Sequence, residues 1–199
     1  MDTYIKAVAV GGSSRSTATI MKTGQTVSQQ TGDDGDTEAG RNVSFFVLAE
    51  NNPFGNTNRF TSTTGNQTYT NTIIIDWATY DGSTVLGWSN TIRGGSNSTW
   101  SQDISAALVL NIGGYSSGWR IPNINEIMSL PNYSYISNYI QYIPFSLGAV
   151  SLSTSTRQTS NNVFKYASAS GAITSVDRFS QFNNYIACRT FTVIGTTLS

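Results

Sequence analysis

The stretch GGYSSGWRIPNINEIMSL, residues 113–130, is the part of this chain that decides its fold. Its opening glycine pair suits the left-handed backbone that ends a helix, so we expect the preceding helix to stop there. Pro122 favours an extended Ile121, which predicts a short strand or corner over residues 119–121. Asn123 and Glu126 have the spacing of a capping box, which predicts that a second helix begins here. The stretch indicates a scaffold rather than a catalytic motif.

The composition restricts the classes of function. The 199 residues are enough for one large domain or for one domain with an extension. The formal net charge is +0, which argues against a general nucleic-acid binder, since such proteins gather Lys and Arg. Charged residues make up 11% of the chain, against about 25% in an average soluble domain. This neutral, hydroxyl-rich composition suits extracellular structures, virion components and adhesins.

The chain has no histidine and one cysteine. The missing histidine removes Ser-His-Asp and Cys-His catalysis, imidazole bases and most zinc sites. Cys188 has no partner within the chain for a disulfide, and its apolar context IACRTF predicts a buried, inert thiol. Arg120 lies between Trp119 and Ile121, so we expect it to be partly buried and paired with Glu126 or an aspartate.

The amino-terminal segment MDTYIKAVAV does not read as a secretion signal, because it begins with an acidic residue and Lys6 interrupts a short apolar run. No segment approaches the roughly 18 apolar residues of a membrane span. If Met1 is the natural start, we expect a protein that is made and folded in a cytoplasm. An outward-facing role would then need release by lysis or a dedicated export route.

Hydrophobic patterning predicts an α+β domain over residues 21–199, preceded by an N-terminal arm over residues 1–20. The arm is interpreted as a strand, 2–10, and a linker, which could dock on a neighbouring protein or on a copy of this chain by strand addition. One helix is expected over 99–112, with a Thr99–Gln102 capping box and Leu108 on its inward face, and another over 124–130. Strands are expected over 42–50, over 59–65 and 67–76 joined at Gly65, and near 149–155, 162–167, 172–176 and 185–193.

Several ordered segments resemble the Lcl C-terminal domain family, which occurs in phage and bacterial surface proteins. Together they cover roughly residues 21 to 193, and the Trp-Arg-Ile-Pro corner and the GDDGD run are the more specific among them. The segments are KTGQTVSQQTGDDGDTEAGR from residue 22, RFTSTTGNQTYTN from residue 59, TWSQDISAALVLNIGGYSSGWRIPNINEIMSL from residue 99, and the closing runs LSTSTR, VFKYASASGAI and YIACRTF.

This resemblance implies a C-type-lectin-like fold, with two helices packed on a twisted antiparallel sheet. The fold is similar to that of the formylglycine-generating enzymes, which rely on paired reactive cysteines. One cysteine cannot supply that pair, so we expect no enzymatic activity. The chain also departs from the family at Leu152 or Ser153, where the family usually has Trp, and at Ala106 or Ala107, where it often has Cys.

The resemblance also implies a ligand face, because late loops form that face in C-type-lectin-like folds. Turn-rich segments 156–162 and 178–184 supply amide side chains to it. A tyrosine-dense segment, 131–145, is a second candidate, since tyrosine offers rigid, amphipathic contact area. The alternative is that these tyrosines only cover a core of isoleucines. The candidate ligand-binding residues are Tyr133, Tyr135, Tyr139, Gln158, Asn161, Asn162, Gln181, Asn183 and Asn184.

Four of the eleven acidic residues surround Gly35. Their oxygens could present several hard ligands to Ca²⁺, although the spacing does not fit an EF-hand loop. The alternative is an Asx-turn loop whose carboxylates cap backbone amides or pair with Arg41. No other cofactor is expected. The candidate calcium ligands are Asp33, Asp34, Asp36 and Glu38.

Two classes of function follow from these observations. The first is a non-enzymatic structural or binding module of a phage virion, such as a tail-fibre tip, a receptor-binding protein or a decoration protein. It would contact other virion proteins or copies of itself, and a host-surface glycan or protein; a secreted bacterial adhesin is the alternative. The second class is a polysaccharide-acting hydrolase that uses two carboxylates as acid and base. Its candidates are Asp76, Asp81, Asp103 and Asp177.

Overall fold

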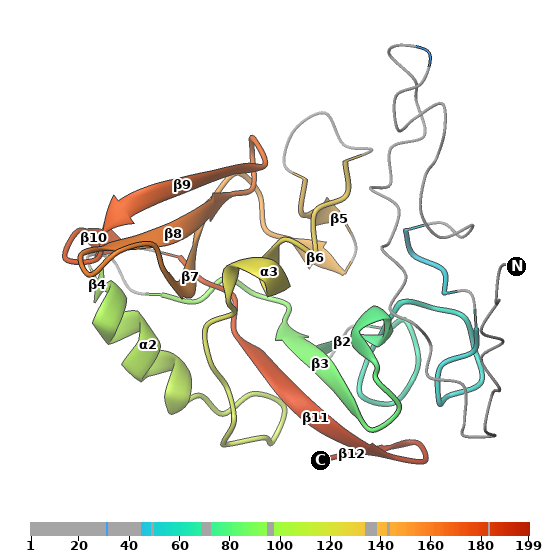
Figure 1. Ribbon diagram of the computed structural model, residues 1–199. Coiled ribbons are helices and arrows are strands. Elements are labelled where there is room, and N and C mark those ends of the chain that lie inside the picture. Colours follow the sequence, from blue (N-terminus) through green and yellow to red (C-terminus); the bar gives the residue numbers. More distant parts are fainter. Residues whose placement is uncertain are drawn as a thin grey trace, which may run out of the picture.

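The computed structural model describes residues 31, 45–48, 50–68, 73–94, 98–133, 139–142, 144–182 and 184–199. Within these residues, helices and antiparallel strands form a β-rich α+β domain, in agreement with the class expected from the sequence (Figure 1). In chain order the elements are β1 Phe60–Thr61, β2 Ile73–Asp76, the 3-10 helix η1 Trp77–Thr79, β3 Thr84–Ser89, β4 Ser98–Thr99, α2 Trp100–Leu108, α3 Ile124–Ile127, β5 Gln141–Tyr142, β6 Phe145–Ser146, β7 Ser151–Arg157, β8 Asn162–Ala167, β9 Ala172–Asp177, β10 Gln181–Phe182, β11 Cys188–Ile194 and β12 Thr197–Leu198.

The larger sheet has the strand order β1-β2-β3-β11-β12 and separates two hydrophobic cores. Because side chains alternate between the faces of a strand, β2 supplies both cores and is buried along its whole length. Ile74 packs with Trp88 in one core, whereas Ile73 and Ile75 pack with Phe191 in the other. The strand expected over 67–76 is therefore confirmed at its apolar end.

Strand β3 is an element that sequence patterning did not identify. A glycine in its centre weakens the strand pattern, since glycine has no side chain to pack. In the fold Gly87 is required, because a Cβ atom at this position would collide with the ring of Phe191 on the neighbouring strand β11.

Helix α2 begins where the sequence predicted but ends earlier. Thr99 caps it, and Gln102 completes the capping box. The helix ends at Leu108, which is 58% exposed, so the prediction of an inward-facing Leu108 in a helix reaching residue 112 was wrong. Gly113 instead forms a tight turn with φ of 60°, and a Cβ there would lie 2.7 Å from Cδ1 of Ile73. The glycine pair thus serves a turn packed on β2 rather than a helix cap.

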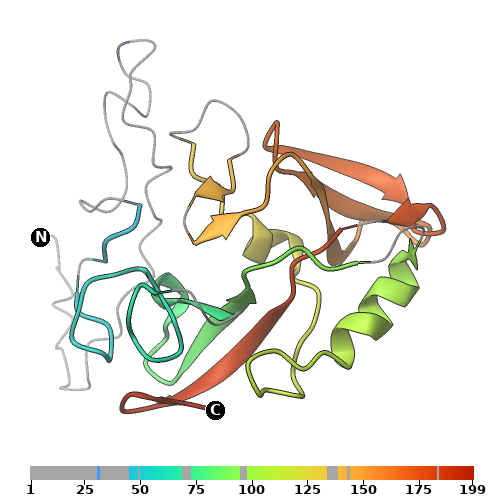
Figure 2. The same cartoon turned by 180° about the vertical axis from the view of Figure 1, so that it is seen from behind.

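The Trp-Arg-Ile-Pro corner packs against β11. Trp119 is buried and donates its indole N–H to the carbonyl of Tyr115 at 2.8 Å. Arg120 exchanges two backbone hydrogen bonds of 2.9 Å with Cys188. Asn123 and Glu126 then form the expected capping box at the start of α3. The corner therefore connects the larger sheet to α3. In both views α3 lies between this sheet and the three-stranded sheet of β7, β8 and β9 (Figures 1 and 2).

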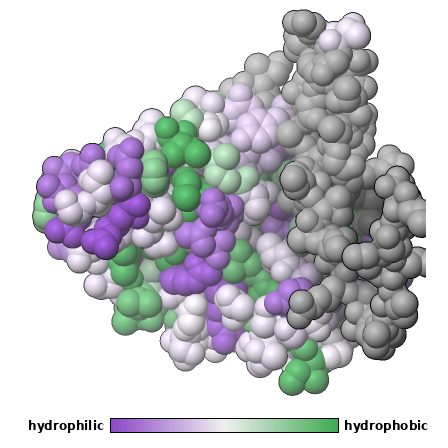
Figure 3. All heavy atoms as spheres, viewed as in Figure 1, coloured by the Kyte–Doolittle hydropathy of each residue, from purple (hydrophilic) through white to green (hydrophobic). Residues whose placement is uncertain are grey.

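The second sheet has the order β7-β8-β9, and its strands agree with the late strands expected from the sequence. Strand β9 is exposed over nearly all of its length. Figure 3 shows hydrophilic residues gathered over the end of the molecule where β8 begins and β9 ends. The strand expected over 42–50 is not formed in its described part, where residues 45 and 46 make a turn and Val47 makes a single bridge to Asn58. The predicted strand 2–10 lies outside the described residues.

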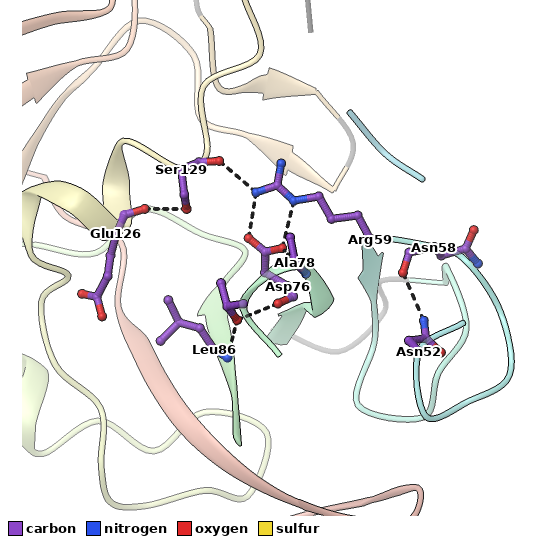
Figure 4. Close-up of polar contacts among 9 residues, drawn as sticks. Asn52, Asn58, Arg59, Asp76, Ala78, Leu86, Glu126 and Ser129 are labelled. Atoms are coloured by element: carbon purple, nitrogen blue, oxygen red, sulfur yellow. Dashed lines mark hydrogen bonds and ion pairs between the residues drawn. The ribbon is translucent and has the colours of Figure 1, made fainter. Parts of the chain in front are cut away.

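A buried ion pair joins Arg59, the residue before β1, to Asp76 at the end of β2 (Figure 4). Arg59 and Asp76 are 1% and 0% exposed, and two hydrogen bonds of 2.9 Å connect the guanidinium to both carboxylate oxygens. The guanidinium also donates to the carbonyl of Ser129 at 2.8 Å and lies 4.4 Å from the ring centroids of Phe45 and Phe60. The Arg59 side chain thus connects the segment before β1 to the larger sheet and to the turn after α3.

Within the described part of the chain, no helix has the length and apolar character needed to cross a membrane.

Removing one charge of the buried pair should be much more harmful than removing both. We expect Asp76→Asn to lower the free energy of unfolding by about 3 to 5 kcal/mol, because it leaves the guanidinium buried without a counter-charge. The double variant Arg59→Met with Asp76→Leu should recover most of that loss, since it removes both desolvated charges. Urea unfolding followed by fluorescence measures both values, and equal losses in the two variants would contradict this prediction.

Candidate functional site

Three of the predicted ligand residues come together at one end of the second sheet, where β7 turns into β8. Gln158 and Asn161 are exposed and Asn162 is half-buried. The backbone N–H of Gln158 donates to the carbonyl of Asn162 at 2.8 Å, which closes the turn. The N–H of Arg178, just after β9, donates to the carbonyl of Asn161 at 2.8 Å and attaches a second turn to the first. We call residues 158–162 together with 177–180 the amide surface.

Two further residues of this surface, Arg178 and Phe179, were not among the ligand-binding residues predicted from the sequence. The Phe179 ring is 64% exposed, and the guanidinium of Arg178 lies 4.6 Å from its centroid. Asp177 holds the turn, because its Oδ1 accepts the N–H of Phe179 at 2.8 Å. The arrangement displays an aromatic face and a cation beside exposed amides. The signal that could have found it is an apolar Phe within the polar turn DRFSQ, where burial is not expected.

The remaining predicted amides do not form one group with these. Gln181 lies in β10, which pairs with β4, and its side chain is outside the described part. Asn183 is also outside it. Asn184 is half-buried, and its carbonyl accepts the N–H of Ser153 at 2.9 Å, so its backbone covers the edge of β7. The segment 178–184 therefore supplies both a surface turn and a structural connection.

The predicted tyrosines form a second group, next to the turn between β8 and β9. The rings of Tyr133 and Tyr139 lie 5.2 Å apart between centroids, tilted by 46°. Both lie close to Gly171 in that turn, and Tyr166 is fully buried beside them. Burial, helped by the two neighbouring tyrosines, raises the pKa of Tyr166. Tyr135 is outside the described residues.

The two groups lie at opposite ends of the same sheet. Strand β8 runs from Asn162, in the amide surface, to Ala167, at the turn beside the tyrosines. Six residues of extended chain span roughly 20 Å. Within one copy of this chain, therefore, the tyrosine pair and the amide surface cannot contact the same small ligand.

The acidic segment predicted to bind calcium, Asp33, Asp34, Asp36 and Glu38, lies outside the described residues. Among the residues that the structure describes, no group of three or more acidic or cysteine side chains could hold a metal ion. The calcium site stays a prediction.

Three of the four scattered carboxylates considered for hydrolysis have a structural role. Asp76 pairs with Arg59, and Asp177 caps the turn at Phe179. Asp81 accepts hydrogen bonds from the backbone and hydroxyl groups of Thr84 and Ser83, led by the Thr84 N–H at 2.7 Å, and these lower its pKa. Because these three carboxylates are already hydrogen-bonded to partners within the fold, their environments do not favour acid–base catalysis of glycoside hydrolysis.

Asp103 differs from the other three because it is buried and weakly compensated. It lies in the first turn of α2 and is 1% exposed. Its Oδ1 accepts the hydroxyl of Ser98 at 2.5 Å, and its Oδ2 has no hydrogen-bond partner in the described structure. Burial raises the pKa of this carboxyl, against the smaller opposing effects of Ser98 and Lys165.

The cysteine and the corner arginine have the environments that the sequence predicted. Cys188 is fully buried, and burial raises its pKa to about 12, so the thiol is protonated and inert at neutral pH. Arg120 pairs with Glu126 through two hydrogen bonds of 2.7 and 2.5 Å. Burial alone would raise the pKa of Glu126, but the bonds from Arg120 and the Asn123 N–H lower it.

No protein-family model matches the chain, and no curated protein matches it significantly. The family resemblance therefore depends on the quoted segments alone.

The buried Asp103 should make stability depend on pH. Its raised pKa in the folded state means that the folded chain holds this proton more tightly than the unfolded chain does. The free energy of unfolding should therefore fall as pH rises from the ordinary value of 3.8 through the raised value. Asp103→Asn should remove this part of the pH dependence and be more stable than the original chain at neutral pH. Thermal melts of both proteins over a pH series measure the difference, and parallel curves would contradict it.

Proposed function

We propose that this chain is a non-enzymatic binding module that recognises a surface glycan through the amide surface. The exposed Phe179 with Arg178 stacked on it carries the proposal. An exposed aromatic ring offers a flat apolar face to the C–H groups of a sugar, while amide and guanidinium groups beside it can hydrogen-bond the hydroxyls. Gln158 and Asn161 supply those amides in the adjoining turn.

We further propose the scaffold to be C-type-lectin-like and of the Lcl C-terminal domain type. The support is the Trp-Arg-Ile-Pro corner, which joins a capped helix to the central antiparallel sheet, and the position of the amide surface on late loops. The source that we propose is a phage virion, in a tail-fibre tip, receptor-binding protein or decoration protein. The balanced charge and the hydroxyl-rich composition support it. A secreted bacterial adhesin would use the same surface and is the alternative source.

The enzymatic alternative is less favoured by the environments of the four candidate carboxylates. A glycosidase needs a protonated and an ionised carboxyl group facing each other across a sugar. Asp76, Asp81 and Asp177 each serve the fold, and Asp103 is buried and accepts the hydroxyl of Ser98. Binding without turnover is therefore the proposed activity.

Truncating the exposed ring should weaken glycan binding. We expect Phe179→Ala to reduce affinity roughly tenfold, which corresponds to about 1.4 kcal/mol, because the stacking face is lost. Ile194→Ala is the matched control: Ile194 is also strongly exposed, at 71%, but lies in the β11–β12 hairpin. Labelled protein on a glycan array, followed by titration of the best ligand, measures both variants. Equal binding by the two variants, or cleavage of the bound glycan, would overturn the proposal.

The proposed virion source has its own test. Mass spectrometry of purified phage particles should detect peptides of this chain in the mature virion, with proteins of the infected cell as the control for contamination. Presence in the lysate but absence from the particles would refute the virion assignment while leaving the glycan-binding proposal intact.

A further inference from the structure

Strand β9 is an open edge of the second sheet. In the described structure it pairs only with β8, and five of its six residues are exposed. The other edge of the sheet is covered, because the N–H groups of Ser153 and Ser155 in β7 donate to the carbonyls of Asn184 and Pro122. The edge strands of the larger sheet, β1 and β12, are two residues long each. Among the described strands, β9 is thus the long edge that remains available for pairing.

The hydrogen-bond pattern shows which backbone groups of β9 point outward. Arg178 donates its N–H to Asn161, so residues 178 and 161 form a hydrogen-bonded pair of the antiparallel ladder. Such pairs alternate along the ladder. With the observed register, residues 172, 174 and 176 therefore bond to β8, and residues 173 and 175 direct their N–H and C=O groups away from it. The N–H of Asp177 also points outward, while its C=O accepts the N–H of Ser180 at 3.0 Å.

The edge lacks the features that prevent strands from pairing between molecules. Exposed edges are commonly protected by lysine, proline or a bulge. The sequence of β9, AITSVD, has neither lysine nor proline, and the irregularity of this sheet lies in β7 between Ser153 and Arg157. The β-branched residues Ile173, Thr174 and Val176 favour extended pairing.

We propose that two copies of this chain pair through β9 in an antiparallel, two-fold symmetric manner centred on Ser175. This register uses all the outward-facing residues. Ser175 would form a hydrogen-bonded pair with Ser175 of the second copy, and Ile173 with Asp177 of the second copy. The two three-stranded sheets would join into one continuous sheet. Such self-complementary contacts are the usual basis of a symmetric dimer.

The side chains are compatible with this register. Thr174 would lie opposite Val176 of the second copy, and the one charge of the strand, Asp177, would lie opposite an isoleucine. No like charges would face each other, which would be the main electrostatic penalty in an antiparallel pair.

The dimer would also bring together the two groups of candidate ligand residues. Antiparallel pairing places the end of β9 in one copy beside its beginning in the other. The amide surface of one copy would thus lie at the same end of the joined sheet as the Tyr133–Tyr139 pair of the second copy. This consequence rests on the proposed function: the dimer would give a ligand contacts from both copies.

Engineered cysteines test the register directly. Residues in a hydrogen-bonded antiparallel pair have Cα atoms about 5.5 Å apart, within the reach of a disulfide. Ser175→Cys should therefore cross-link two copies under mild oxidation. Thr174→Cys is the matched control, because the two Thr174 residues would be about 8 Å apart, beyond that reach. The native Cys188 is buried and should not react in either variant.

Mass in solution tests the pairing without cross-links. Light scattering over a dilution series should give twice the 21.5 kDa mass of one chain at high concentration. Ser175→Pro removes a central outward N–H without touching the ladder to β8, and Ser175→Lys places two like charges at the centre, so both should be monomeric. Ile173→Lys should remain dimeric, because its ammonium group would face Asp177 of the second copy. If the chains instead associated through non-specific apolar contacts, the same substitution should weaken the dimer.

Three results would overturn the pairing: a monomeric original chain, a dimer that survives both Ser175 substitutions, or equal cross-linking by the two cysteine variants. The outcome is separable from the proposed function. Phe179→Ala should lose glycan affinity and stay dimeric, while Ser175→Pro should lose the dimer. Because the Ser175 hydroxyl also donates to Oε1 of Gln158 in the amide surface, Ser175→Ala is the control for glycan affinity: it loses that bond but keeps the outward N–H, so it should stay dimeric.

Discussion

The buried pair of Arg59 and Asp76 is the interaction on which the arrangement of this fold depends. Two charges removed from water are tolerated only when each finds its hydrogen bonds, and here the guanidinium reaches both carboxylate oxygens and the carbonyl of Ser129. Its flat faces lie against Phe45 and Phe60. The requirement to satisfy one arginine therefore sets the relative positions of β1, the end of β2 and the turn that follows α3.

Charged residues are scarce in this chain, and several others that the structure describes also stabilise the fold. Asp81 and Asp177 stabilise turns, and Glu126 pairs with Arg120 at the start of α3. At the amide surface, the polar groups that the described structure presents to a ligand are amides, hydroxyls and the guanidinium of Arg178 on the Phe179 ring. That inventory fits recognition of a neutral, hydroxyl-rich ligand better than it fits acid–base catalysis.

Local signals predicted much of the fold. The capping boxes at Thr99 and Asn123 depend on residues a few positions apart, so the sequence displays them directly. Strand β3 was missed because Gly87 is explained only by the ring of Phe191, about a hundred residues away. The end of α2 was misplaced because glycine is needed at position 113 for its turn to pack against Ile73, and not to end the helix before it.

The sequence by itself determined the α+β class and the residue types that could contact a ligand. It also excluded catalysis that depends on histidine or on paired cysteines. Those follow from composition and short-range periodicity, which involve no distant contact. Only the tertiary structure decided that the described ligand residues divide between the two ends of one sheet and that β9, among the described strands, pairs only with β8. These features depend on strand order and register, which arise from contacts between residues far apart in the chain and leave no local pattern.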